Sequence, residues 1–153
     1  MFDRLATWLN NGQENFAGSQ DELQLAVAAL LIEAARIDDA FDERERGAIQ
    51  RLLQQRFGLG PDEARRLEDA ADRNEQRSAQ LFGFIRTINE RVPAPQRIGI
   101  IEMLWEVAYA DGVLDPLEDT LLRRIAGLID VSDHERGEAK LRVLQRLGLQ
   151  PAQ

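Results

Sequence analysis

Cysteine is absent from this chain of 153 residues, and histidine occurs once, at His134. Without cysteine the protein has no disulfide bond, no thiolate nucleophile and no zinc site built on Cys ligands. A single imidazole also excludes any site that needs two, so hard oxygen donors are the remaining plausible metal ligands. His134 falls in the first turn of the expected last helix, and no nucleophile accompanies it, so we expect it on the surface.

Basic residues and long apolar runs are also scarce. The chain has 19 Lys and Arg against 27 Asp and Glu, which gives a net charge of −8. This balance argues against nucleic acid and anionic membrane surfaces as partners, and it favours cations or a basic protein. No apolar run approaches the ~20 residues that span a bilayer, and the N-terminus lacks a secretory signal. We therefore expect a cytoplasmic protein without direct membrane insertion.

Apolar residues recur at helical spacing throughout the chain, and no segment alternates in the manner of a half-buried strand. The sequence predicts an all-α fold in a single domain, residues 1–153, with about eight helices packed as a compact bundle. Two segments, 20–37 and 98–110, are almost continuously apolar, which is typical of central helices. Ser19 with Glu22 resembles a capping box and predicts the start of the first of them. The other expected helices cover residues 2–9, 42–56, 61–73, 76–91, 116–128 and 132–147.

An acidic stretch occurs twice, because Leu31–Glu45 and Leu104–Glu118 align without a gap. We call residues 38–45 the first acidic corner and residues 111–118 the second, since each joins two expected helices. The chain therefore divides into an N-terminal helix and loop (1–19), a first repeat (20–92) and a second repeat (93–147), which predicts approximate two-fold symmetry. The aligned acids are Glu33 with Glu106, Asp38 with Asp111, Asp42 with Asp115 and Glu45 with Glu118.

Helix capping accounts for some of these acids. Asp42 and Asp115 stand at expected N-caps, and Glu45 and Glu118 follow three residues later, where a capping glutamate lies. Because losing such a cap typically costs ~1 kcal/mol, structure alone can explain these four carboxylates.

The other aligned acids need a different explanation. Asp38 and Asp111 stand where a helix ends, and the helix dipole disfavours an aspartate there by ~0.3–1 kcal/mol. Glu33 and Glu106 interrupt apolar helices, and a buried carboxylate must be paired or hydrogen-bonded. Backbone N–H groups of the corner, an arginine or a bound cation would compensate. Arg36 is the local candidate partner for Glu33, whereas Glu106 has no basic residue one turn away.

A divalent cation is the functional interpretation of the corners. Residues 38–45 hold five acids and one arginine, and residues 111–119 hold four acids and no base, which is unfavourable unless something positive neutralises them. Carboxylates without imidazole or thiolate suit Ca²⁺, Mg²⁺ or Mn²⁺. An EF-hand is excluded, because twelve-residue loops counted from Asp38 or Asp111 end on Ile49 and Leu122. The predicted ligands are Asp38, Asp42, Glu45, Asp111, Asp115 and Glu118, with Glu33 and Glu106 as further candidates.

Three phrases resemble the TerB-like family of bacterial tellurite-resistance proteins: LWEVAYADGVLDPLE at 104–118, EAARIDDAFDERE at 33–45 and LFGFIRTINE at 81–90. The domain is also similar to the N-terminal cytoplasmic part of a membrane-anchored DnaJ-like co-chaperone, although this chain has no J domain. The resemblance covers about residues 20–147. It implies a duplicated all-helical fold with a divalent-cation site at the six corner carboxylates. Asp39 and Ala40 stand where the second corner has Gly112 and Val113, which argues against equal use of the two corners.

The leading hypothesis is a cytoplasmic, non-enzymatic module that binds a divalent cation or a basic partner and serves a stress or tellurite-resistance system. No catalytic residue is predicted, and core packing is favoured for Trp105 and Tyr109 over a stacking platform. Two alternatives stay open. One is a metal-dependent hydrolase with carboxylates holding two ions about 3.5–4 Å apart. The other is a metal-free scaffold whose acidic face docks an Arg-rich protein, with salt-sensitive affinity.

Overall fold

The structure, a computed structural model of the chain, describes residues 17–37, 41–73 and 79–150. Within these ranges the chain forms seven α-helices and one short 3-10 helix, and it forms no strand. The predicted all-α class is confirmed, and the helix expected at residues 2–9 lies outside the described residues. The helices are α2 (Ala17–Arg36), α3 (Glu43–Phe57), α4 (Pro61–Asp72), α5 (Leu81–Arg91), η1 (Ala94–Gln96), α6 (Arg97–Ala108), α7 (Pro116–Leu128) and α8 (Asp133–Leu147).

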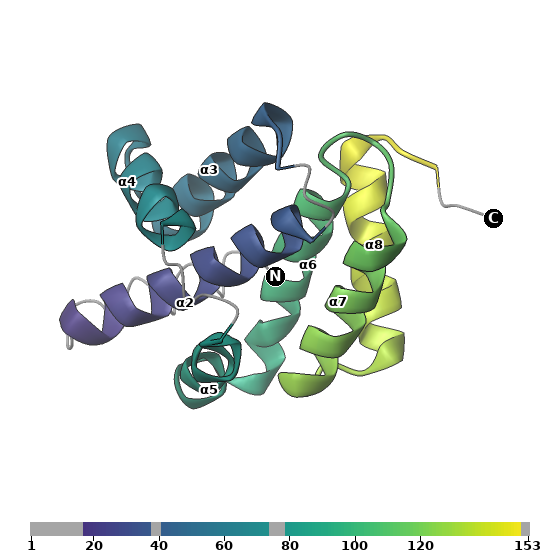
Figure 1. The fold of residues 1–153 in the computed structure, drawn as a ribbon. Helices are drawn as coiled ribbons and strands as arrows, with labels where there is room; N and C mark the ends of the chain where they lie inside the picture. The colour runs from purple at the N-terminus through teal and green to yellow at the C-terminus, as the bar shows by residue number, and fades with distance from the viewer. Residues whose placement is uncertain (1–16, 38–40, 74–78, 151–153) are drawn as a thin grey trace.

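Helices α2 and α6 cross at the centre of the molecule, and the other helices surround them (Figure 1). α2 packs against α3, α4, α5 and α6, while α6 also packs against α3, α7 and α8. Because both helices are apolar on nearly all sides, enclosure from several directions removes the most apolar surface from water. Leu30, Ile32, Ile101 and Leu104 are completely buried. Although α2 is long and apolar, no described helix has the length and hydropathy needed to cross a membrane.

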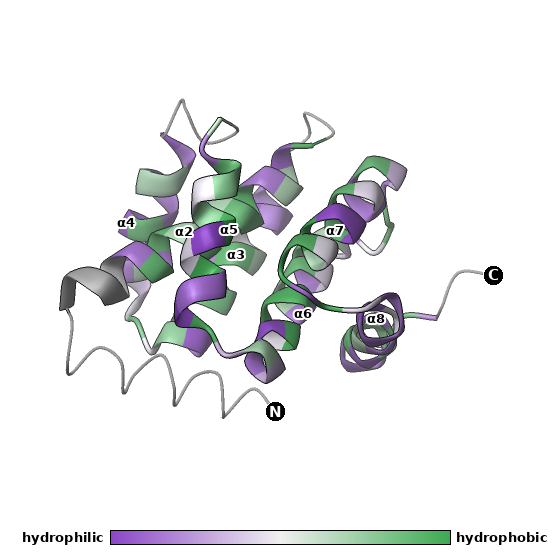
Figure 2. Cartoon of the chain, turned by 90° about the horizontal axis from the view of Figure 1, so that it is seen from below, coloured by the Kyte–Doolittle hydropathy of each residue, from purple (hydrophilic) through white to green (hydrophobic). Residues whose placement is uncertain are grey.

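The outer helices bury one face each, and α7 and α8 show alternating hydrophilic and hydrophobic bands (Figure 2). Their ends follow the local sequence signals. Ser132 and Glu135 form a capping box at α8, with the Ser132 N–H 3.0 Å from Glu135 Oε1 and the Glu135 N–H 3.1 Å from Ser132 Oγ. Pro61 opens α4, and Gly58 ends α3 with φ 66°, in the left-handed region that glycine adopts at low cost.

The start of α2 differs from the expected one. The structure describes α2 from Ala17, so the start expected at Ser19 and Gln20 falls inside the helix. The side chain of Ser19 lies outside what the structure describes, so the capping box itself stays a prediction. Adding residues to an existing helix costs far less free energy than nucleating one. A long, well-packed α2 can therefore extend past a capping signal that would start a shorter helix.

Contacts between the two repeats are reciprocal, because α3 packs against α6 and α7 packs against α2. The third helices also correspond, because α4 packs against α2 and α3 as α8 packs against α6 and α7. Within the described ranges α5 of the first repeat has no counterpart in the second. Two-fold symmetry therefore stays a prediction.

Two side chains expected in the core are buried there. Trp105 is 1% exposed and Tyr109 is 7% exposed, with their ring centroids 6.1 Å apart. The Trp105 indole N–H donates to the carbonyl oxygen of Arg136 at 3.1 Å, which ties α6 to α8. The side chain of His134 is 83% exposed, as predicted for a surface residue.

Truncation of a central leucine tests the role of α6. Leu104→Ala should lower the free energy of unfolding by about 2–5 kcal/mol, because it leaves a cavity in a fully buried site. Leu141→Ala on α8 is the matched control, since that leucine is 54% exposed and its loss should change stability by less than about 0.5 kcal/mol. Urea unfolding of both variants measures the difference, and equal losses would contradict the central placement of α6.

Candidate functional site

The first acidic corner begins α3. The Asp42 carboxylate accepts from the Glu45 N–H at 2.9 Å, and Glu45 Oε1 accepts from the Asp42 N–H at 3.3 Å. Glu45 is 6% exposed, whereas Asp42 is exposed. The capping hydrogen bonds predicted for these two residues are therefore present. Asp38, Asp39 and Ala40 lie outside the described residues.

Two arginines flank the first corner and hold it to α4. Their guanidinium carbons lie over the Phe41 ring, that of Arg36 5.0 Å from the ring centroid and that of Arg46 4.4 Å from it. Both arginines reach Asp72, at 2.7 Å for Arg36 and 3.5 Å for Arg46. Such cation–π contacts and ion pairs place positive charge beside the corner acids. Arg36, expected to serve Glu33, thus pairs with Asp72 of α4, and Glu33 is partly buried.

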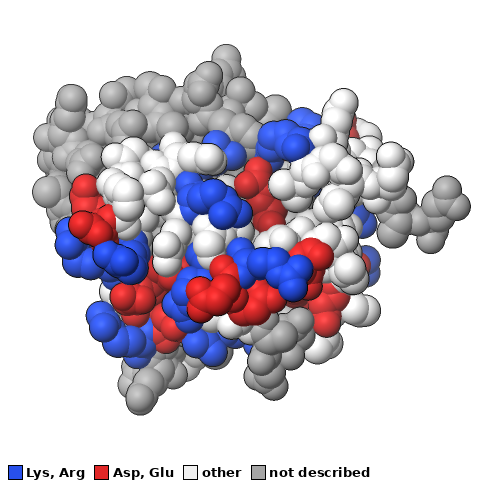
Figure 3. All heavy atoms as spheres, turned by 90° about the horizontal axis from the view of Figure 1, so that it is seen from above, with Lys and Arg blue, Asp and Glu red and all other residues white. Residues whose placement is uncertain are grey.

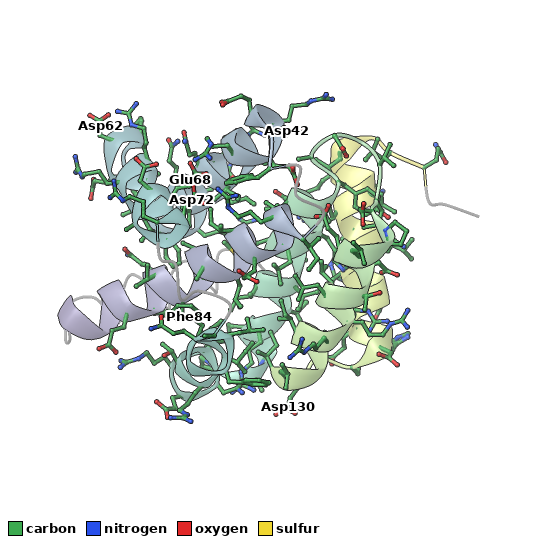
Figure 4. All side chains as sticks on the ribbon, in the orientation of Figure 1. Asp42, Asp62, Glu68, Asp72, Phe84 and Asp130 are labelled. Carbon is green, nitrogen blue, oxygen red and sulfur yellow. The ribbon has the colours of Figure 1, made fainter. Side chains whose placement is uncertain are left out.

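Glu68 lies at the buried end of this network (Figure 4). It is 0% exposed, and its Oε1 accepts from Gln50 Nε2 at 2.9 Å and from Arg46 Nη1 at 3.3 Å. Burial raises the pKa of Glu68 above its ordinary value, and the hydrogen bond from Gln50 and the charge of Arg46 oppose that rise only in part. The residue was not singled out from sequence, because it stands among the alternating charges of α4.

The second acidic corner joins α6 to α7 through backbone hydrogen bonds. Asp111 Oδ1 accepts from the Val113 N–H at 3.0 Å, and Asp115 Oδ1 accepts from the Leu117 N–H at 2.7 Å. The residue after Asp111, Gly112, has φ 85°, which only glycine adopts without strain. The expected compensation of Asp111 by the following backbone is therefore present. Glu118, at the first turn of α7, is 3% exposed.

The two corners differ in their counter-charges. Within the described ranges neither Asp111 nor Asp115 forms an ion pair, and the second oxygen of each carboxylate makes no hydrogen bond. The positions that align with Arg36 and Arg46 are Tyr109 and Asp119, so the second repeat supplies no arginine there. Seen from above, the molecule carries acidic and basic side chains interleaved over one face (Figure 3). The second corner thus lacks the two arginines that pack on Phe41 beside the first.

The remaining predicted ligand, Glu106, binds an arginine from α8. Arg146 Nη2 lies 2.6 Å from Glu106 Oε1, and Arg146 Nη1 lies 2.8 Å from Glu102 Oε1. Glu102 is only 1% exposed and also faces Arg142 at 3.6 Å. Burial acts to lower the pKa of Arg146, but its hydrogen bonds to both glutamates outweigh burial and raise the pKa. The spacing of Arg142 and Arg146, one turn apart on α8, was the available sequence signal for this partner.

The described side chains form no group of three or more Asp, Glu or His residues placed to hold a metal ion. Asp42 and Glu45 bind each other's backbone, and Glu106 is engaged by Arg146. The oxygens that fit a hard cation best are those of Asp111 and Asp115, since each carboxylate keeps one oxygen without a protein partner.

Comparison with known proteins gives one match. A family model described as Tellurite resistance protein TerB matches residues 24–141, which include α3 to α7, both acidic corners and most of α2. Neither the comparison with curated proteins nor that with solved structures found a match.

The pH dependence of stability tests the state of Glu68. Because the folded-state pKa is raised, ionisation of this carboxyl costs more in the folded than in the unfolded protein. As the pH rises from the ordinary value of 4.5 through the folded-state pKa, Glu68 should therefore lower the stability of the wild type. Glu68→Gln removes this titration, so the stability of wild type minus that of the variant should fall over this pH range. Urea unfolding across the range measures it, and a rising difference would show that Arg46 and Gln50 dominate.

Proposed function

The chain belongs to the TerB family of tellurite resistance proteins, and from this premise we propose that it is a non-enzymatic, cytoplasmic module of a tellurite-resistance or related stress system that binds a divalent cation. Asp111 and Asp115 of the second acidic corner are its principal ligands. The single observation that supports this most is the uncompensated charge of these two carboxylates, in contrast to the arginine-flanked first corner.

Geometry favours a hard cation over other ligands at this corner. Backbone hydrogen bonds to Asp111 and Asp115 fix one oxygen of each carboxylate and orient the other. Fixed carboxylate oxygens, with water completing the shell, suit Ca²⁺, Mg²⁺ or Mn²⁺. Glu118, Asp42, Glu45 and Asp38 stay predicted ligands, although the described side chains bring no three acids into one metal-binding group.

The acidic corner also suits a basic protein partner, which is the competing proposal. A guanidinium group pairs with a carboxylate through two parallel hydrogen bonds, and the free oxygens of Asp111 and Asp115 are acceptors of that kind. A cation that binds the folded protein must raise its melting temperature by mass action, whereas a basic peptide gives salt-sensitive association without any cation effect.

Thermal unfolding in the presence of Ca²⁺, Mg²⁺ or Mn²⁺ tests the proposal. At a cation concentration a hundred times its Kd, the folded state should gain about 2.7 kcal/mol. Asp111→Asn and Asp115→Asn should abolish the gain without changing stability in chelator by more than about 0.5 kcal/mol, because asparagine accepts the same backbone hydrogen bonds.

Asp62→Asn is the control variant, since Asp62 is an exposed first-turn aspartate on α4, away from both corners. It should keep the full cation response. Absence of any melting shift in the wild type, together with salt-sensitive binding of an Arg-rich peptide that Asp111→Asn abolishes, would replace the cation by a basic partner.

A further inference from the structure

A cleft of about 330 Å³ lies next to the second acidic corner and has no part in the proposal above. Three elements form it: α3, the C-terminal end of α6 with its following turn, and the end of α8 with the residues that follow it. Its volume lies at the lower end of the range of ligand sites, about 300–1,000 Å³. The lining residues are Ala48, Arg51, Leu52, Gln55, Glu106, Tyr109, Ala110, Gly112, Leu147 and Leu149.

The cleft combines an apolar surface with a few polar groups. The apolar part is supplied by Leu52 from α3, by Leu147 at the end of α8 and by Leu149 just after it. Leu147 is 43% exposed, whereas most of the large aliphatic side chains that the structure describes are buried. An apolar lining with few convergent polar groups is the usual composition of a small-molecule site.

Arg51 supplies the uncompensated charge of the cleft. Within the described ranges it forms no ion pair, although the chain carries a net charge of −8. The acid on the opposite wall, Glu106, is already bound by Arg146 at 2.6 Å. Arg51 is therefore the group of the cleft that would pair with an anionic ligand.

Tyr109 supplies a second polar group without a partner. The residue lines the cleft and is 7% exposed, and its hydroxyl oxygen is buried without a hydrogen bond. Leaving such a group unsatisfied costs free energy, and a ligand that reaches this wall would supply the missing partner.

We propose that the cleft between α3, α6 and α8 binds a small organic monocarboxylate, whose carboxylate pairs with Arg51 and whose apolar chain of about five carbons packs on Leu52, Leu147 and Leu149. A guanidinium fork matches a planar carboxylate with two parallel hydrogen bonds. A phosphate dianion fits less well, because the helix end that faces the cleft is the C-terminus of α6, the negative pole of its dipole.

Titration of the full-length protein with hexanoate tests the proposal, with hexanol as the uncharged control ligand. Amide NMR should show hexanoate shifting the signals of Ala48 and Gly112 at the cleft, and not that of Gly137 on α8, which is not among the cleft residues. Hexanol should bind at least about tenfold more weakly, because it lacks the charge-assisted pair with Arg51.

Two arginine variants separate the cleft from general electrostatics. Arg51→Gln should raise the Kd for hexanoate at least about tenfold. Arg66→Gln removes the same charge from an exposed position on α4 that is not part of the cleft, and it should leave the Kd unchanged. Equal effects of the two variants, or no shift at Ala48 and Gly112, would overturn the proposal.

Tyr109→Phe gives a readout that a purely structural hydroxyl would not give. Without ligand, this variant should melt about 2–4 °C higher than the wild type, because it removes a buried hydroxyl that has no partner. With hexanoate, it should bind more weakly than the wild type. If Tyr109→Phe is less stable than the wild type and binds hexanoate with the same Kd, the hydroxyl stabilises the fold. Tyr109 is then not part of the proposed ligand site.

Because hexanoate and its arginine contact involve no cation, these experiments are carried out in chelator. If divalent cations do not raise the melting temperature of the wild type, the proposed function is refuted and the proposed ligand site in the cleft is not affected. Loss of hexanoate binding would refute the cleft and leave the cation proposal untouched.

Discussion

The packing of α2 against α6 is the constraint on which the rest of the structure depends. Both helices are apolar on nearly every side, so neither can lie on a surface, and each must be covered by its partner and by the shorter helices. Once the two are central, the chain that follows α6 emerges at the surface, where Asp111, Gly112 and Val113 are exposed. The position of the second acidic corner therefore follows from the burial of the helix before it.

The two corners begin from the same sequence pattern and acquire different electrostatic surroundings. The first corner receives Arg36 and Arg46, whose acidic partners Asp72 and Glu68 belong to α4. Helix α8 packs on α6 and α7 as α4 packs on α2 and α3, but the second repeat has no arginine at the positions that align with Arg36 and Arg46. The duplicated acidic pattern thus starts a helix in both halves, and the two copies differ in the arginines that pack beside them.

Helix α8 supplies the arginine that pairs with the acidic side chains of α6. Its Arg146 neutralises Glu102 and Glu106, which would otherwise be carboxylates in the most apolar helix of the second half. A buried charge that loses its partner is strongly destabilising, so this ion pair fixes α8 against α6. The end of α8 also lines the cleft together with α3 and α6, so the same helix that stabilises the core contributes to a candidate ligand site.

The sequence by itself determined the helical class, the centrality of α2 and α6, most helix ends and the backbone role of Asp42 and Asp115, because periodicity, burial and capping are local properties. It also indicated the family, through phrases that span both corners. Only the tertiary structure decided which acids are neutralised, since Glu106 meets Arg146 from 40 residues away and Arg36 meets Asp72 from another helix. The cleft of Arg51 and Tyr109 is likewise absent from any local pattern, because residues of three separate helices form its walls and chain folding alone brings them together.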